Sequence, residues 1–142
     1  MVCGSVVSNN DNALTRRLKR DYNSDVYYYD FTKKDSASTP LLITQLTNNY
    51  DKIIFGIHQI NRAPANNFNI SADALSLIDS VQHLKSSLIL LFGNAYASKN
   101  WCNAKNLVVC YEDDSIVQNT ALDFLEAKLK FKGTLPVSVC EN

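Results

Sequence analysis

Two short, uninterrupted runs of apolar residues constrain this sequence more than any other feature. One is Leu88–Phe92 and the other is Leu107–Tyr111, and a short polar segment follows each run. A strand with one face in water alternates apolar and polar residues, whereas a continuous apolar run indicates a strand that is covered on both faces. Such strands are typical of parallel sheets. We expect function in the loops after these runs, because ligands bind beyond the carboxyl ends of parallel strands.

The rest of the chain alternates β-prone segments with segments of helical periodicity. The expected strands are Val2–Ser8, Asp25–Phe31, Lys52–His58, Leu88–Phe92 and Leu107–Tyr111. The expected helix caps are Asn9–Asp11, Thr39, Ser71 and Ser115, with a further short helix in Tyr96–Cys102. Alternating strands and helices predict right-handed crossovers. We therefore expect a flavodoxin-like, doubly wound α/β three-layer sandwich, with a mainly parallel five-stranded sheet in the order 2-1-3-4-5 and helices on both faces.

Charge and hydropathy exclude two classes of partner. Lys plus Arg and Asp plus Glu both total 14, so the formal net charge is zero. General nucleic-acid binding requires a basic excess, so we expect no nucleic-acid partner, and we interpret Arg16–Arg20 as a solvated helix face. No apolar run approaches the roughly 18 residues of a membrane span, so we expect no membrane partner. At 142 residues, one domain is the simplest organisation.

The start of the chain and its cysteines suggest neither a leader peptide nor a metal site. Met1–Ser5 lacks a charged leader and leads at once into a strand, so we expect a fragment of a longer protein. The cysteines are Cys3, Cys102, Cys110 and Cys140, and none forms a CxxC pair. The histidines His58 and His83 are distant in sequence, so we expect no metal site. We interpret Cys110, within an apolar strand, as a core residue. The spacing of the cysteines leaves open whether any disulfide forms.

The sequence lacks the motifs of the cofactor-binding and catalytic sites that are common in this fold. Ser8–Asn12, after the first strand, lacks the glycines of a flavin-phosphate loop, and GxGxxG and the P-loop are both absent. A phospho-acceptor receiver domain would have an Asp at the end of the third strand and a Lys at the end of the fifth. Here the third strand ends in His58 and the fifth ends at Tyr111-Glu112, so the pattern is absent. There is no GxSxG nucleophile elbow. We therefore expect no cofactor.

The remaining candidates are the acids Glu112, Asp113 and Asp114 after the fifth strand. Adjacent carboxylates could act as acid and base, or accept hydrogen bonds from sugar hydroxyls. Asp113 and Asp114, with Ser115, could instead cap the following helix and complement its dipole. The residues alone favour this capping interpretation.

Three segments of the second half resemble a known family. They are Leu91–Ala97 (LFGNAYA), Tyr111–Asp114 (YEDD) followed by Val117-Gln118, and Lys132–Ser138 (KGTLPVS). In this order and spacing they resemble the second domain of glycoside hydrolase family 3 β-N-acetylglucosaminidases. Asn61–Pro64 and Phe68 resemble the loop after the third strand of that family more loosely. The resemblance covers Phe68–Ser138 well and the first 50 residues weakly.

The resemblance implies a domain without its own catalytic residues. Those enzymes are retaining glycosidases, and in the N-acetylglucosaminidase branch the aspartate nucleophile and an Asp-His pair belong to a preceding (β/α)8 barrel. The implied partner is therefore that N-terminal barrel of the same protein, with indirect contact to an N-acetylglucosaminide. The implied candidates for the sugar-site rim or the domain interface are His58, Arg62, Asn94, Tyr96, Glu112, Asp113 and Asp114. The alternative is a stand-alone flavodoxin-like module that binds a ligand or partner.

Departures from the family pattern lead to two further expectations. Ala95 replaces a frequent proline, and Ala127 and Lys130 replace a frequent helix-stopping glycine and a proline. The last helix is then expected to run longer before Gly133. Leu135–Val139 is expected as an extended tail at the sheet edge or outside the ladder. The bacterial enzymes of this family that the resemblance suggests are typical of the periplasm.

Overall fold

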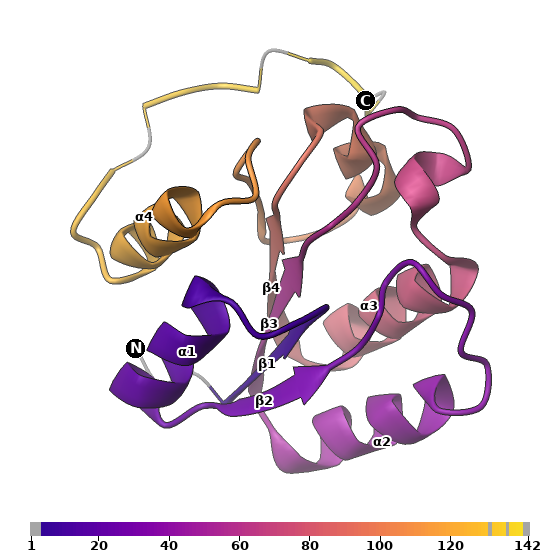
Figure 1. Ribbon diagram of the computed structural model, residues 1–142. Coiled ribbons are helices and arrows are strands. Elements are labelled where there is room, and N and C mark those ends of the chain that lie inside the picture. Colours follow the sequence, from indigo (N-terminus) through magenta and orange to yellow (C-terminus); the bar gives the residue numbers. More distant parts are fainter. Residues whose placement is uncertain (1–3, 131, 136, 141–142) are drawn as a thin grey trace.

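A computed structural model describes residues 4–130, 132–135 and 137–140 of the chain (Figure 1). Five parallel strands form the sheet in the order β2-β1-β3-β4-β5. They are β1 Ser5–Ser8, β2 Asp25–Tyr28, β3 Lys52–Ile57, β4 Ser86–Leu91 and β5 Leu107–Val109. This confirms the predicted fold class and strand order. The start of the predicted first strand, at Val2 and Cys3, lies outside the described residues.

Helices cover both faces of the sheet and complete three layers (Figure 1). The α-helices are α1 Ala13–Tyr22, α2 Thr39–Asn49, α3 Ala72–Leu84 and α4 Ser115–Leu125, and the short 3-10 helices are η1 Asn67–Asn69 and η2 Ala95–Trp101. Helices α1 and α4 pack on one face, and α2 and α3 pack on the other. In the part of the chain that is described, no helix is long and apolar enough to cross a membrane.

The central strands are buried on both faces, which explains their uninterrupted apolar sequences. Successive residues of a strand point to opposite faces. Val6, Ile54 and Leu90 belong to the cluster under α1 and α4, whereas Val7, Phe55 and Leu91 belong to the cluster under α2 and α3. All six side chains are at most 5% exposed. A run such as Leu88–Phe92 therefore supplies both hydrophobic layers, as a parallel sheet requires.

The helix caps lie near the predicted positions, with shifts of a residue or more at three of them. Asn12, rather than Asn9–Asp11, caps α1 by accepting a hydrogen bond from the Thr15 amide at 3.1 Å. Asp114, rather than Ser115, caps α4, and Ser38 precedes α2 where Thr39 was expected. Ser71 caps α3 as predicted. At α1 and α4 the shifted cap still binds a free amide at the helix start, whereas the Ser38 side chain makes no such bond.

Strand β2 is an edge strand, as the predicted strand order places it, but it is shorter than expected. It ends at Tyr28, which is 58% exposed, and not at Phe31. Tyr29 and Phe31 follow the strand, and the Tyr29 amide still donates to the Ser8 carbonyl at 2.9 Å. Both side chains are buried and pack against each other with ring centroids 5.4 Å apart. Burial of these rings bends the chain under α2 and ends the strand early.

The expected lengthening of α4 is wrong. The helix ends at Leu125, and Ala127 adopts a left-handed conformation with φ 59°. The amide of Lys128 then donates to the Asp123 carbonyl at 2.9 Å, which closes the helix end. Alanine thus takes the backbone conformation that a glycine usually provides. Ala121 and Leu122 lie on the buried face of α4, while Phe124 is only half-buried.

The chain after α4 forms no strand within residues 132–135 and 137–140. The interpretation of Leu135–Val139 as a tail outside the ladder is therefore correct for the residues that are described, and Pro136 falls outside them. A disulfide bond between Cys102 and Cys140 ties this tail to the end of η2. Sequence spacing had left this bond open.

An ion-pair cluster joins α1 to α4 on one face of the sheet. The Arg17 guanidinium donates to Asp123 at 2.6 Å, to Glu126 at 2.9 Å and to the Asn119 carbonyl at 3.1 Å. Its side chain is only 14% exposed. Tyr22 also donates to Glu126 at 2.7 Å. The two helices are therefore held together by charge as well as by apolar packing.

We expect Arg17→Met to lower the free energy of unfolding by about 1–3 kcal/mol, between the values for exposed and buried ion pairs. Urea denaturation at neutral pH measures the change. Arg20→Met is the matched control, because among the described residues Arg20 forms an ion pair only with Asp21, and its side chain is 73% exposed. Equal effects of the two substitutions would contradict the role of Arg17.

Candidate functional site

The direction of chain winding reverses between β1 and β3, because β2 lies on one side of β1 and β3 on the other. In open parallel sheets, the crevice beyond the carboxyl ends of such a strand pair is the usual ligand position. The loops after β1 and β3 meet here, since the His58 amide donates to Asn9 Oδ1 at 3.0 Å. This point is the centre of the candidate site.

His58, directly after β3, is buried and held in place on two sides. Its side chain is 1% exposed, and its ring stacks on Phe92 with centroids 4.4 Å apart and planes 8° apart. Its Nδ1 lies 2.6 Å from Asp113 Oδ1. A Cβ atom added at Gly56 would lie 2.9 Å from His58 Nε2, so the ring occupies space that only glycine leaves free.

Asp113 is the acceptor at the centre of this site, with both carboxylate oxygens engaged. Oδ1 accepts from His58 and from Gln118 Nε2 at 2.9 Å, and Oδ2 accepts from the Gln59 amide at 3.0 Å. Burial raises the pKa of Asp113, but the hydrogen bond and charge of His58 and the bonds from Gln59 and Gln118 outweigh it. The pKa is therefore below its ordinary value. The carboxylate stays ionised at neutral pH.

Gln118 extends this network to the start of α1. Its Oε1 accepts from the Ala13 amide at 3.0 Å, while its Nε2 donates to Asp113. The first turn of α1 would otherwise offer that amide to a ligand. Side chains of the chain itself therefore occupy the crevice, and the Asp113 carboxylate takes the place of a bound anion.

Two polar atoms in the crevice are buried and lack a partner among the described residues. They are His58 Nε2 and Asn9 Nδ2. His58 Nδ1 faces Asp113, so Nε2 is the ring nitrogen that is left without a partner. Nε2 faces the backbone of Gly56, which lies against Leu14, and not the solvent. The imidazole is therefore closed off from any substrate at the surface.

Asn94 connects the loops after β3 and β4. Its Nδ2 donates to the Arg62 carbonyl at 2.7 Å, and its Oδ1 accepts from the Tyr96 amide at 2.9 Å, which caps η2. Arg62 is exposed and the Tyr96 side chain is 55% exposed. The structure thus brings Arg62, Asn94 and Tyr96 together at the carboxyl edge of the sheet.

The loop after β3 contains four successive residues in the left-handed conformation. Asn66, Asn67, Phe68 and Asn69 have φ values from 52° to 63°. Asparagine tolerates this conformation, and Phe68 is fixed in it because its ring is only 1% exposed. Asn67 and Asn100 exchange two amide hydrogen bonds of 2.9 and 3.1 Å. This loop is therefore held against η2 by one buried ring and one amide pair.

The three acids after β5 have three different environments. Asp113 pairs with His58, and Asp114 caps α4 by accepting from the Val117 amide at 2.8 Å. The side chain of Glu112 is exposed and forms no hydrogen bond within the described residues. The capping interpretation is therefore correct for Asp114 and wrong for Asp113. Burial, with the Asp113 charge, raises the pKa of Cys110 to about 12, so its thiol remains protonated.

Sequence reasoning singled out His58 and Asp113 but did not pair them. It missed Asn9, Gly56 and Gln118 as parts of the crevice. Gln118 lies within a segment that carries the family resemblance, which was the available signal. In the part of the chain that the structure describes, no group of three or more His, Cys, Asp or Glu residues could hold a metal ion.

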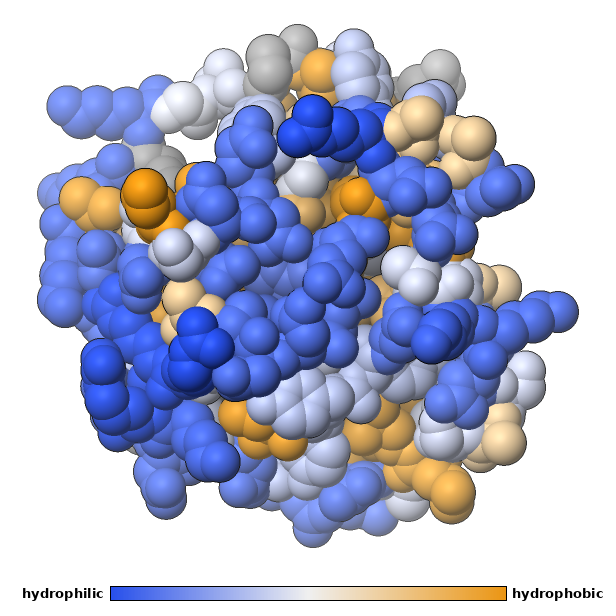
Figure 2. Space-filling view, viewed as in Figure 1, coloured by the Kyte–Doolittle hydropathy of each residue, from blue (hydrophilic) through white to orange (hydrophobic). Residues whose placement is uncertain are grey.

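Two surface pockets of about 400 Å³ each lie away from this crevice. One lies at the amino end of β4 and includes Lys85 and Lys105. The other is mainly apolar and lies beside β5 and α4. On the face shown in Figure 2 the surface is mostly hydrophilic, with small separate apolar patches.

Neither a scan against protein-family models nor a search of curated proteins finds a match. A search of solved structures finds a protein described as "A unique GCN5-related glucosamine N-acetyltransferase region exist in the fungal multi-domain GH3 beta-N-acetylglucosaminidase", with a TM-score of 0.71 and 16% sequence identity. The match covers 98% of this chain and 16% of the other. This chain thus corresponds to about a sixth of that multi-domain protein, and at this identity the likeness shows the fold.

We expect Asp113→Asn to lower the free energy of unfolding by about 1–3 kcal/mol, because an amide cannot accept from all the donors around Asp113. The folded pKa of Asp113 lies below its ordinary value of 3.8. The stabilising contribution of its carboxylate is therefore complete well above 3.8 and is lost as the pH falls through the lower folded value. Urea denaturation between pH 7 and pH 3, roughly spanning that window, measures both effects. Glu112→Gln is the control and should change little. A difference between wild type and Asp113→Asn that grows on acidification would contradict this account.

We expect Gly56→Ala to destabilise the fold by about 1–3 kcal/mol, because overpacking forces neighbours to shift. The added Cβ would lie 2.8 Å from Leu14 Cδ2 and 2.9 Å from His58 Nε2. Gly133→Ala is the control, since nothing lies within 4 Å of its added Cβ. Thermal unfolding compares the two variants. A Gly56→Ala protein as stable as the control would show that the His58 ring is not confined there.

Proposed function

We propose that this chain is a non-catalytic companion domain of a glycoside hydrolase family 3 β-N-acetylglucosaminidase. Its role is to pack on a (β/α)8 barrel that cleaves terminal N-acetylhexosaminides. The observation that carries the proposal is the closed crevice around Asp113. The best-placed acid, Asp113, is bound to the buried imidazole of His58, and both of its carboxylate oxygens accept hydrogen bonds, so the crevice offers no free acid and base.

The geometry of the acids also argues against hydrolysis by this chain. A retaining glycosidase needs two carboxyl groups about 5 Å apart that face the scissile bond. Asp113 is bound by three donors and Asp114 caps a helix, which leaves Glu112 as the free carboxylate of the three. One carboxylate cannot act both as nucleophile and as acid.

The resemblance and the structural neighbour support the same parent protein. The segments that resemble the family, Leu91–Ala97 and Tyr111–Asp114, begin at the ends of β4 and β5. The neighbour's name describes a multi-domain GH3 β-N-acetylglucosaminidase, and 98% of this chain aligns with a region of it. Disulfides persist in oxidising compartments, which is compatible with the expected extracytoplasmic location.

In this proposal, the exposed groups at the carboxyl edge would line the sugar site or the domain interface. Arg62, Tyr96 and Glu112 are exposed there, and Asn94 positions the first two. Arginine and tyrosine are frequent in well-packed interfaces. His58, Asp113 and Asp114 would contribute indirectly, by fixing the loops that carry the exposed groups.

A second candidate is acetyl transfer to an amino sugar, because the neighbour's name includes a GCN5-related glucosamine N-acetyltransferase region. Acetyl-coenzyme A is a polyanion and needs free amide donors or cations. In the crevice the Asp113 charge would repel it, and the Gln59 and Ala13 amides are already bonded. The same argument disfavours a stand-alone module that binds a phosphorylated ligand in the crevice.

The test compares this fragment with the full-length protein on 4-nitrophenyl N-acetyl-β-glucosaminide. We expect 4-nitrophenol release by the full-length protein and none above the buffer blank by the fragment. Release by the fragment that is lost in Glu112→Gln would overturn the proposal and assign catalysis to that carboxylate.

Calorimetric titration of the fragment with acetyl-coenzyme A and with flavin mononucleotide separates the alternatives. The companion-domain proposal expects no heat of binding from either compound. Saturable binding of acetyl-coenzyme A would favour acetyl transfer, and binding of the flavin would favour a ligand module. Asp113→Asn is the informative variant, because removing that charge should strengthen any anion binding in the crevice.

A further inference from the structure

The sheet is only partly covered at β5. This edge strand has three residues, Leu107–Val109, and all three are only half-buried. No strand pairs with its outer side in the described chain. The apolar pocket of about 400 Å³ lies against it, between β5 and the helix α4. An apolar strand edge of this kind is a site of unwanted pairing unless something covers it.

The chain after α4 is what covers this pocket. Gly133, Thr134 and Leu135 form its outer wall, opposite residues of β5 and α4. Figure 1 shows this segment leaving α4 and passing over the carboxyl end of the sheet toward η2. We call its described residues, 132–135 and 137–140, the C-terminal strap.

Little besides the disulfide holds the C-terminal strap. Its residues are in no helix or strand, and no hydrogen bond or ion pair among the described residues joins them to the rest of the chain. Residues 132–135 are exposed, and the Leu135 side chain is 46% exposed. Cys140 is half-buried and bonded to Cys102, which is exposed. A segment with so few contacts is expected to open easily when its tether is removed.

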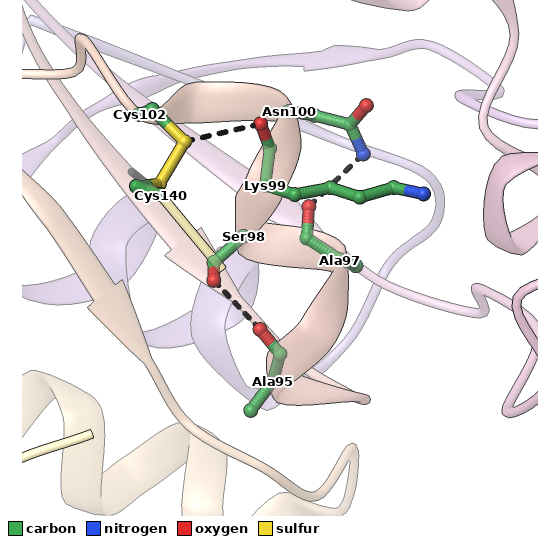
Figure 3. The surroundings of a disulfide bond; sticks show 7 residues. All are labelled: Ala95, Ala97, Ser98, Lys99, Asn100, Cys102 and Cys140. Atoms are coloured by element: carbon green, nitrogen blue, oxygen red, sulfur yellow. Dashed lines mark hydrogen bonds between the residues drawn. A yellow bond between two sulfur atoms is a disulfide. The ribbon is translucent and has the colours of Figure 1, made fainter. Parts of the chain in front are cut away.

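The other end of the disulfide, at Cys102, is held rigidly by the structure around η2. Cys102 follows η2, whose turns are closed by hydrogen bonds from Ser98 Oγ to the Ala95 carbonyl at 2.7 Å and from Asn100 Nδ2 to the Ala97 carbonyl at 2.9 Å (Figure 3). Trp101 is 3% exposed and belongs to the core cluster under α2 and α3. Breaking the disulfide therefore leaves η2 in place and frees only the strap.

We propose that the C-terminal strap is a redox-dependent cover of the β5 edge, closed while Cys102 and Cys140 are joined and open when they are reduced. An external dithiol supplies the two electrons and two protons. One of its thiolates attacks a sulfur of the disulfide, its second thiol resolves the mixed disulfide, and Cys102 and Cys140 leave as thiols. Opening exposes the apolar pocket along Leu107–Tyr111 and α4. This inference does not depend on the proposed function.

Cys110 is a built-in reporter for the test, because it is a free cysteine that lines the pocket. In a Cys3→Ser background it is the only free thiol while the disulfide is intact. We compare its rate of alkylation by iodoacetamide with that in Cys3→Ser/Cys102→Ser/Cys140→Ser. The proposal expects the rate to rise by roughly tenfold or more once the tether is lost, as for a locally opened segment. An unchanged rate would overturn it.

Hydrogen exchange in the wild-type protein, with and without dithiothreitol, distinguishes local from general opening. It also serves if the triple variant does not fold. We expect faster exchange in Leu107–Val109 on reduction, with unchanged exchange at Val7 and Phe55 in the central strands. Equal acceleration in both places would mean that the disulfide stabilises the whole domain, and would overturn the idea of a strap. No acceleration in Leu107–Val109 would do so as well.

Discussion

The ionised carboxylate of Asp113 is the interaction on which the carboxyl edge of this sheet depends. It accepts from the His58 side chain, the Gln59 amide and the Gln118 side chain, and Gln118 in turn binds the first amide of α1. One side chain thereby joins the loops after β3 and β5 to two helix starts. Charge-assisted hydrogen bonds are stronger than neutral ones, and here they replace what a ligand does in other doubly wound sheets.

This replacement has a direct consequence for function. A crevice at the switch point usually leaves helix amides and a cavity for a phosphate or a cofactor. Here Gly56 leaves space for the His58 imidazole, and Phe92 stacks on that ring. Asp113 accepts the hydrogen bonds of the surrounding donors. The polar residues that look catalytic in the sequence are therefore used to build the edge. That arrangement is the reason for proposing a companion domain.

The sequence predicted the parts of the fold that depend on local pattern. The uninterrupted apolar runs predicted the parallel sheet, because residues such as Ile54 and Phe55 must fill opposite layers. The pairing of His58 with Asp113 was not predictable, because the residues are 55 positions apart and each has a common local role. The Cys102–Cys140 bond, across 38 positions, likewise has no local signal. The end of α4 was missed because Ala127 adopts a conformation that propensity assigns to glycine.

The two edge strands of the sheet, β2 and β5, are stabilised in different ways. Strand β2 is short, but Tyr27 and Tyr50 join it to α2 through a 2.7 Å hydrogen bond, and Tyr50 donates to Asp25. Strand β5 has no such side-chain bridge to the strap, and its cover is an irregular segment fastened by a covalent bond. Hydrogen bonds and burial re-form spontaneously after local opening, whereas a reduced disulfide needs an oxidant to re-form. The stability of the β5 edge therefore depends on the redox state of the surroundings, whereas that of the β1–β3 centre does not.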